Sequence, residues 1–324
     1  LLTSANAHLL SQVWRLGVIP RSLNMAELVT LPKDKDPTVC GNRRPISITS
    51  ALYRVMTSVL ASRLSWALVR TGFIPCEQNA YLPQEECMAQ VCALMEVCQR
   101  RQEVGLQTVV LAADIAAAFD SVNHSQVLHF ARRAGANGSV LRLLEAMYAN
   151  ATVTVRIGKV HTAPFQITKG VRQGCPASAI LFIMTTARML EGLEGVRVPM
   201  AAKVVKGPNN YLTLAPSSAA MPPAMCYGFL FADDCAAVFQ RLLDAIAGGA
   251  RLTDNARINR FTHNPSKSSI MALPSARNRT AVRDARTALS EASVTLGPPP
   301  NNVVPTAPNH SMRYLGVNLP QSLL

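Results

Sequence analysis

The sequence lacks the features that mark membrane and secreted proteins. Its longest apolar run, around residues 177–190, is too short to span a bilayer and contains Arg188. No signal peptide opens the chain. The first residue is Leu1 rather than Met, which predicts a fragment, a processed product or a truncated reading frame. These observations argue against membrane insertion and against a secretory route.

Regularly spaced cysteines are also missing. The eight cysteines form no CxxC pair, and Cys87, Cys92 and Cys98 fall in a segment with helical periodicity. Their spacing suits neither a zinc knuckle nor a disulfide framework. We therefore expect free thiols in a reducing compartment, which places the protein inside the cell, in the nucleus or the cytoplasm.

Acidic residues are scarce relative to basic ones. The 324 residues include 19 Asp and Glu against 32 Lys and Arg, which gives a formal net charge of +13. That sign suits a polyanionic partner such as nucleic acid, although a basic solvated surface would produce it equally. Apolar residues make up 49%, enough for a substantial core in one large or two ordinary domains.

Periodicity predicts a mixture of helices and strands without strict βαβ alternation, which favours an α+β fold. Helical spacing of apolar residues extends over 7–17, 51–68, 85–105, 125–136, 139–150, 175–194, 241–261 (where a Gly-Gly pair predicts a break) and 275–292. Extended segments are expected at 28–50, 107–114, 227–240 and 313–319, with a hairpin over 151–170. The stretch 195–226 is expected to be an insertion or a mobile loop, and 296–311 a Pro-rich linker.

Two adjacent aspartates stand within the apolar stretch YGFLFADDCAAVFQ. No Lys or Arg lies in this window, yet a carboxylate removed from water needs a partner. A tight hairpin would place Asp233 at its tip, with Asp234 beside it, facing Asp114 at the end of the apolar run TVVLAAD. Mg²⁺ bound between such strand ends would form a two-metal site of the polymerase kind. A solvated Asp-Asp turn is the alternative interpretation.

Six motifs in a fixed order extend the first interpretation over most of the chain. They are LPKDKDPTVCGNRRPISITS, DIAAAFDSVNH, KGVRQGCPASAILF, FADD, HNPSKSSIM and YLGV, between residues 31 and 317. Together they resemble the motifs of a reverse transcriptase, most closely of the non-LTR (LINE-type) retrotransposon class. The resemblance implies an α+β right-hand polymerase fold with an antiparallel palm sheet and with a thumb that is absent or rudimentary.

The resemblance also implies a division of the chain into three segments. Fingers with a helical N-terminal extension would occupy residues 1–110. The palm would occupy 111–275 and would contain the insertion at 195–226. Residues 276–324 would form a basic helix, a linker and the primer-grip segment.

The same resemblance implies roles for individual residues. Asp114, Asp233 and Asp234 would be the catalytic carboxylates and would bind two Mg²⁺ or Mn²⁺ ions. The residues implied to contact the incoming dNTP are Lys33, Arg44, Phe119, Gln173 and Lys267, with Phe119 as the bulky gate that excludes a 2′-hydroxyl. The residues implied to contact the template or the primer are Gly170, Arg172, Gly174, Tyr314, Leu315 and Gly316. An ordinary surface, turn or core position is the alternative for each residue outside the aspartate triad.

The implied activity is RNA-directed DNA synthesis, with an RNA template, a DNA primer and dNTPs as partners and with no role for a membrane. An RNA-dependent RNA polymerase is one rival, and Phe119 argues against it. A group II intron maturase is another, less favoured because GVRQGCP fits LINE-type enzymes better. The third is a catalytically silent or truncated retroelement remnant that acts at most as an RNA-binding, palm-like module.

Overall fold

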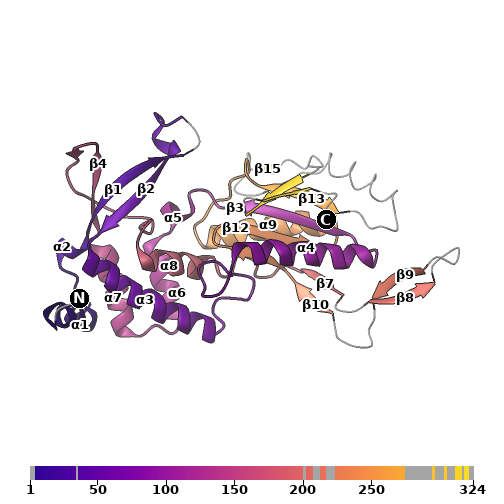
Figure 1. The fold of residues 1–324 in the computed structure, drawn as a ribbon, viewed down its shortest axis with the longest axis horizontal. Coiled ribbons are helices and arrows are strands. Elements are labelled where there is room, and N and C mark those ends of the chain that lie inside the picture. Colours follow the sequence, from indigo (N-terminus) through magenta and orange to yellow (C-terminus); the bar gives the residue numbers. More distant parts are fainter. Residues whose placement is uncertain are drawn as a thin grey trace. The chain divides into compact units, whose positions relative to one another are not determined.

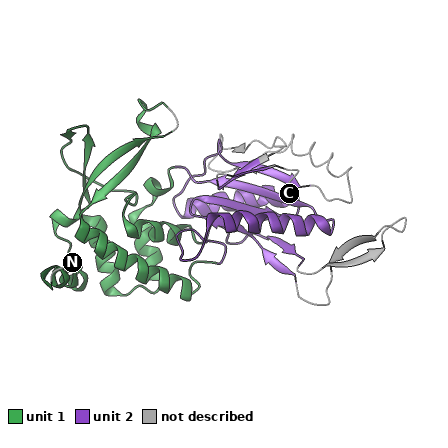
Figure 2. Cartoon of the chain, in the orientation of Figure 1, with its two compact units in different colours: residues 1–75, 117–187 green, residues 76–116, 188–324 purple. Residues whose placement is uncertain are grey.

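The computed structural model describes residues 4–33, 36–199, 202–206, 212–216, 223–273, 294–295, 303–304, 311–315 and 317–320. The chain forms two compact units, and each unit is built from two separate segments (Figure 2). Unit 1 comprises Leu1–Pro75 and Ala117–Ala187, and unit 2 comprises Cys76–Ala116 and Arg188–Leu324. The assignment of fingers to 1–110, palm to 111–275 and a C-terminal segment to 276–324 stays a prediction.

Unit 1 contains a group of helices (Figure 1), and several of their ends follow local sequence signals. They are α1 (Ser4–Leu16), α2 (Arg21–Asn24), α3 (Ala51–Arg70), α5 (Ala118–Ser121), α6 (His124–Arg133), α7 (Gly138–Ala149) and α8 (Pro176–Thr186). The first helix ends where Gly17 adopts a left-handed φ of +68°, and Ser50 caps α3 by accepting from the Tyr53 N–H. Pro176 occupies the first turn of α8, where its missing N–H costs nothing.

The sheet of unit 1 has the strand order β2-β1-β4-β5, and β6 also pairs with β4. The strands are β1 (Met25–Pro32), β2 (Arg43–Thr49), β4 (Thr152–Ile157), β5 (Val160–His161) and β6 (Phe165–Gln166); the short 3-10 helix η1 (Cys40–Asn42) precedes β2. Strand β1 runs antiparallel to β2 and parallel to β4. The predicted hairpin over 151–170 is confirmed, with Gly158 at its turn in a left-handed conformation.

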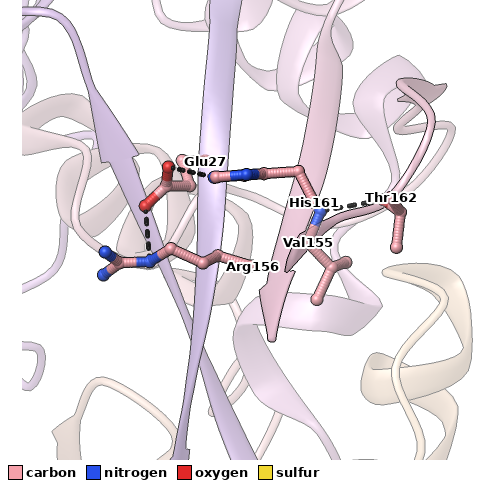
Figure 3. Close-up of polar contacts among 5 residues, drawn as sticks. All are labelled: Glu27, Val155, Arg156, His161 and Thr162. Carbon is pink, nitrogen blue, oxygen red and sulfur yellow. Dashed lines mark hydrogen bonds and ion pairs between the residues drawn. The ribbon is translucent and has the colours of Figure 1, made fainter. Parts of the chain in front are cut away.

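Polar contacts join the hairpin to β1. Figure 3 shows the Glu27 carboxylate between the Arg156 guanidinium and the His161 ring, each 2.9 Å away. The Val155 N–H donates to the Thr162 hydroxyl at 3.0 Å. Because the Glu27 and Arg156 side chains are partly exposed, their ion pair contributes at most about 1 kcal/mol to folding.

Unit 2 is organised around an antiparallel sheet with the order β11-β12-β3-β13. The strands are β3 (Thr108–Asp114), β11 (Gly228–Phe231), β12 (Asp234–Phe239) and β13 (Ser269–Leu273). The helices α4 (Cys87–Glu103) and α9 (Leu242–Ile258) both pack against it. On β3 every residue before Asp114 is buried, which is typical of a strand covered on both faces.

The two faces of this sheet meet different helices. One face contributes Val110 and Ala112 to a core with Val91 and Leu94 of α4. The other meets α9, where a Cβ added at Gly248 would lie 2.2 Å from the Phe239 ring. Strand β3 is therefore packed between α4 on one face and α9 on the other.

The remaining strands in the described parts of unit 2 form four antiparallel pairs. They are β7 (Val196–Val198) with β10 (Ala224–Cys226), β8 (Ala202–Lys206) with β9 (Leu212–Pro216), β14 (Val294–Thr295) with β15 (Val303–Val304), and β16 (Ser311–Tyr314) with β17 (Val317–Pro320). Strand pairs thus occupy much of the stretch 195–226, which was predicted to be an insertion or a mobile loop. No helix among the described residues is long and apolar enough to cross a membrane.

Two predicted helices differ from the observed ones. The Gly-Gly pair does not interrupt α9, because Gly248 permits the close approach to Phe239 that a larger residue would block. The helix expected over 175–194 ends at Thr186. The basic helix predicted at 275–292 lies outside the described residues.

Candidate active site

The FADD motif forms the strand–turn–strand that its sequence predicts. Phe231 on β11 pairs with Asp234 on β12, and Ala232 and Asp233 make the connection. Ala232 has a φ of +59°, a left-handed conformation that costs a residue with a Cβ about 1–2 kcal/mol. The turn that presents the aspartates is therefore strained and needs support from its surroundings.

Three carboxylates gather at one end of the unit 2 sheet. Asp234 is the register partner of Asp114 across β12 and β3, while Asp233 precedes it in the turn. Burial raises the pKa of each of these carboxyls above its ordinary value. The charges of Asp233 and Asp114 add to burial at Asp234 and bring its pKa to about 6. The structure thus brings together the three residues that the sequence predicted, with Asp234 rather than Asp233 opposite Asp114.

Lys267 brings a positive charge to the aspartates. Its Nζ lies 3.5 Å from Asp114 Oδ2, and the charge of Lys267 lowers the pKa of all three carboxyls against the effect of burial. Backbone hydrogen bonds fix the loop that carries it: Asn264 N donates to the Asp114 carbonyl, and Lys267 N to the Asn264 carbonyl. Lys267 thus neutralises part of the aspartate charge, and its role toward a dNTP stays a prediction.

The donor set fits divalent cations. Asp114 Oδ2 is buried, and its ion pair with Lys267 is long at 3.5 Å, so this charged acceptor can still bind a ligand. No group of three or more His, Cys, Asp or Glu side chains in the described parts of the chain has ion-holding geometry. Mg²⁺ does not require one, because it usually binds one or two carboxylates together with substrate phosphates and water.

Phe119 lies in unit 1, five residues after Asp114 in the chain. Its half-buried ring stacks on Phe182 of α8, with centroids 4.9 Å apart and an interplanar angle of 16°. Its carbonyl accepts from Val171 N at 2.9 Å. The ring thus stacks on a buried aromatic residue, and the backbone of Phe119 is hydrogen-bonded to the loop that precedes α8.

That loop, residues 170–174, packs closely against its neighbours. Gly170 N donates to the Val122 carbonyl, and a Cβ at Gly170 would lie 3.1 Å from the Asp120 Cα. A Cβ at Gly174, whose φ is +108°, would lie 2.7 Å from the Ser47 carbonyl oxygen. Both positions therefore require glycine, and this close packing brings the loop against β2 and α5.

A pocket of about 300 Å³ opens beside the same loop. Asp120 and Gln173 line it, and Gln173 Nε2 donates to Asp120 Oδ1 at 3.4 Å. Ser47 N donates to the Gln173 carbonyl at 2.7 Å and so fixes the backbone that carries this side chain. The amide of Gln173 thus faces a cavity of the size that small ligands occupy.

Arg172 points inward rather than toward a ligand. It is 6% exposed, and its guanidinium donates to the side-chain and backbone oxygens of Asn24 and lies 5.2 Å from the Tyr53 ring centroid. In this conformation Arg172 anchors the loop. A direct contact with template or primer stays a prediction.

The two cations expected at a triphosphate differ in their surroundings. Lys33 is exposed, its Nζ donates to the Gly41 carbonyl at 3.2 Å, and its charge lowers the pKa of Asp120 against the larger effect of burial. Arg44 is exposed on β2 opposite Leu31. Both side chains are accessible to an anion.

The three residues expected to grip the primer differ in their exposure and in whether the structure describes them. Tyr314 is 2% exposed in the core beside α4, and its hydroxyl donates to Gln90 Oε1 at 3.4 Å. Leu315 is partly buried and has a left-handed φ of +49°. Gly316 lies outside the described residues. As placed here, Tyr314 is a core residue, and a contact of this segment with a primer stays a prediction.

Three side chains that the sequence interpretation did not single out contact the candidate site residues or line the pocket: Asp120, His124 and Gln78. Asp120 lines the pocket, and His124 Nε2 donates to the Gly170 carbonyl at 2.8 Å while its ring stacks on Tyr148. Gln78 contacts the backbone of Ala232. Nothing local marks Gln78, because its partner is 154 positions away.

Comparison with known proteins places the chain among reverse transcriptases. The family model described as "Reverse transcriptase (RNA-dependent DNA polymerase)" matches residues 31–319. The uncharacterized 149 kDa protein of transposon TX1 from Xenopus laevis is 28% identical over 235 residues, which cover 72% of this chain and 16% of that protein.

Two Pol polyproteins from R2 retrotransposable elements are similar as well. The protein from Popillia japonica is 28% identical over 179 residues, 55% of this chain and 25% of the relative. The R2DM protein from Drosophila melanogaster is 28% identical over 178 residues, 55% of this chain and 16% of the relative. The matched region therefore spans a quarter or less of these relatives.

Solved structures share the fold at low sequence identity. Telomerase from Candida tropicalis in complex with a TWJ fragment of telomeric RNA aligns with a TM-score of 0.53 and 10% identity, over 82% of this chain and 44% of that one. The apo telomerase from Candida tropicalis, truncated from its C-terminal domain, aligns with a TM-score of 0.50 and 10% identity, over 83% of this chain and 55% of that one. The right-hand polymerase fold predicted from the motifs is confirmed. Because the family match covers nearly the whole chain, this protein belongs to the reverse transcriptase (RNA-dependent DNA polymerase) family, and its similarity to non-LTR retrotransposon proteins is confirmed.

Proposed function

We propose that this chain extends a DNA primer with dNTPs on an RNA template. In this reaction the primer 3′-hydroxyl attacks the α-phosphate of the dNTP, a new phosphodiester bond forms, and pyrophosphate leaves. The observation that carries the proposal is the pairing of Asp114 with Asp234 at the end of a buried sheet, with Asp233 beside them. Carboxylates with raised pKa values, crowded at one strand end, are typical of functional sites.

Asp114, Asp233 and Asp234 are the residues that would hold two Mg²⁺ or Mn²⁺ ions. When bound, such ions stabilise the attacking and leaving oxygens of an in-line displacement. The carboxylates would keep the ions at the strand ends, and the Lys267 ammonium would limit the charge that remains in their absence. Lys267 is 64% exposed, so it is also accessible to a leaving phosphate.

Residues of unit 1 would select and hold the nucleotide. Phe119, supported by Phe182, would lie against the sugar and leave no room for a 2′-hydroxyl. Gln173 would donate to the nucleotide from its place in the pocket, and the exposed Lys33 and Arg44 would bind phosphate oxygens. The described geometry of each side chain is compatible with its role.

Template and primer would be held largely through charge. The net charge of +13 favours a polyanionic duplex, and such binding weakens as salt increases. The loop of Gly170, Arg172 and Gly174 and the segment of Tyr314, Leu315 and Gly316 are the proposed contact regions. The eight cysteines are free, which suits action inside the cell, in the nucleus or the cytoplasm.

Primer extension tests the proposal directly. The purified chain would be given a DNA primer on an RNA template with Mg²⁺ and with either dNTPs or rNTPs. We expect extension with dNTPs, and loss of extension in Asp114→Asn and Asp233→Asn while duplex binding persists. An exposed aspartate on α9 provides the control, Asp254→Asn, which should extend normally.

Two outcomes would overturn the proposal. Preferential use of rNTPs would identify an RNA polymerase. Duplex binding without any extension, by a chain whose circular dichroism shows it folded, would identify the silent remnant.

A further inference from the structure

The strained turn that carries the aspartates is held by one buried side chain from another part of unit 2. Gln78, in the loop before α4, is 0% exposed. Its Oε1 accepts from the Ala232 N–H at 3.0 Å, and its Nε2 donates to the Ala232 carbonyl at 3.5 Å. A single amide group therefore engages both backbone polar groups of the residue that precedes Asp233.

Ala232 is the position in this turn where such support matters most. Its left-handed φ of +59° is unfavourable for a residue with a Cβ, and conformations of this kind persist only where the surroundings enforce them. The backbone angles of Ala232 set the direction in which the chain enters Asp233 and Asp234. A relaxed Ala232 would redirect both carboxylates.

The loop that carries Gln78 is itself fixed to the edge of the sheet. Leu230 N donates to the Glu77 carbonyl at 2.7 Å, and Asn79 N donates to the Leu230 carbonyl at 3.2 Å. Gln78 and Leu230 form a parallel β-bridge. The loop therefore extends the sheet beyond β11, and the position of the Gln78 side chain is determined by backbone pairing.

A second set of contacts reaches the same loop from α4. Gln90 Nε2 donates to the Glu77 carbonyl at 3.3 Å, and Gln90 Oε1 accepts from the Tyr314 hydroxyl at 3.4 Å. Gln90 and Tyr314 are 1% and 2% exposed. The segment at Tyr314 is thus linked through buried hydrogen bonds to the loop that holds the FADD turn.

We propose that Gln78 is a positioning residue that keeps Ala232 left-handed and thereby aims Asp233 and Asp234. It acts through the backbone of Ala232. The consequence for catalysis rests on the proposed polymerase function, whereas the effect on the turn itself does not.

The test compares Gln78→Met with the double variant Gln78→Met/Ala232→Gly in the full chain. Methionine keeps the length of the side chain and removes its amide. We expect lower amide-exchange protection at residues 233–235, and a fall of about 100-fold in kcat for dNTP incorporation with little change in duplex affinity. Glycine adopts left-handed angles without penalty, so Ala232→Gly in the same chain should restore part of both kcat and protection.

The matched control is Gln99→Met, at an exposed glutamine of α4 that donates to Glu103. It should leave exchange and kcat at wild-type values. Wild-type protection in Gln78→Met, or a double variant no better than the single one, would overturn the proposal. If the wild-type chain incorporates no nucleotide, the polymerase function fails, and the exchange measurements alone decide whether Gln78 holds the turn.

Discussion

Asp114 on β3 and Asp234 on β12 lie directly opposite each other in an antiparallel ladder. Side chains at such positions have Cβ atoms about 4.5–5.5 Å apart. Asp233 adds a third carboxylate, and among the described side chains Lys267 and Arg313 oppose this charge at Asp234. The fold thus maintains a concentration of negative charge whose unfavourable energy a bound cation can offset.

The pH dependence of stability follows from the raised pKa of Asp234. Between the ordinary value of 3.8 and about 6, the folded state binds more protons at this group than the unfolded state does. The free energy of unfolding therefore falls as pH rises through this window, and the penalty is complete above it. Asp234→Asn should melt at a higher temperature than the wild type at pH 7.5 and at a similar temperature near pH 4. If Asp234→Asn raised the melting temperature equally at both pH values, the difference would not come from the raised pKa of Asp234.

Divalent cations should stabilise the folded chain even without substrate. A ligand that binds only the folded state at 100 times its Kd adds about 2.7 kcal/mol to the free energy of unfolding. We expect Mg²⁺ to raise the Tm of the wild type, and to raise that of Asp114→Asn or Asp233→Asn much less. The exposed control Asp254→Asn should respond as the wild type does. An equal response in all four proteins would indicate general ionic effects.

Sugar selection should depend on the Phe119 ring. Phe119→Val should increase rNTP incorporation relative to dNTP incorporation, because a smaller side chain leaves space for a 2′-hydroxyl. Phe182→Leu is the comparison variant: it retains the Phe119 ring and removes only its stacked partner, so it should change the ratio less than Phe119→Val does. Competition between the two nucleotide classes measures the ratio. An unchanged ratio in Phe119→Val would make Phe119 an ordinary packing residue.

His124 offers a separable pair of contacts. His124→Phe keeps a ring to stack on Tyr148 and leaves the Gly170 carbonyl without its donor, whereas His124→Gln keeps a donor and loses the ring. Burial lowers the pKa of His124, so the neutral ring is the form that donates at pH 7. We expect His124→Phe to raise the KM for dNTP more than His124→Gln does, because the loop at Gly170 loses its anchor. Equal KM values would show that the hydrogen bond does not position this loop.

Close packing at Gly248 should outweigh helix propensity. Alanine in a helix interior is favoured over glycine by about 1 kcal/mol. The added Cβ of Gly248→Ala would collide with the Phe239 ring, and overpacking of a core costs about 1–3 kcal/mol. We therefore expect a lower free energy of unfolding in urea. Gly41→Ala, where nothing lies within 4 Å of the added Cβ, is the control.

Local signals in the sequence determined most of the elements. The helix expected over 7–17 ends at Leu16 before the left-handed Gly17, the helix expected from 175 begins at Pro176, and the FADD turn joins two strands as predicted. These features depend on backbone preferences and on periodicity within a few residues, so they can be read without tertiary information. The ordered motifs likewise determined the family and the fold class.

Contacts between distant segments decided the rest. The register that places Asp234 opposite Asp114, and the burial of Arg172 against Asn24, involve partners more than 100 positions apart. The close approach of Gly248 in α9 to the Phe239 ring of β12 likewise depends on how the helix packs against the sheet. The sequence by itself predicted which residues carry the chemistry, and it determined which local elements hold them. Only the tertiary structure decided which side chains support them, because register, burial and close approach depend on partners that no local pattern specifies.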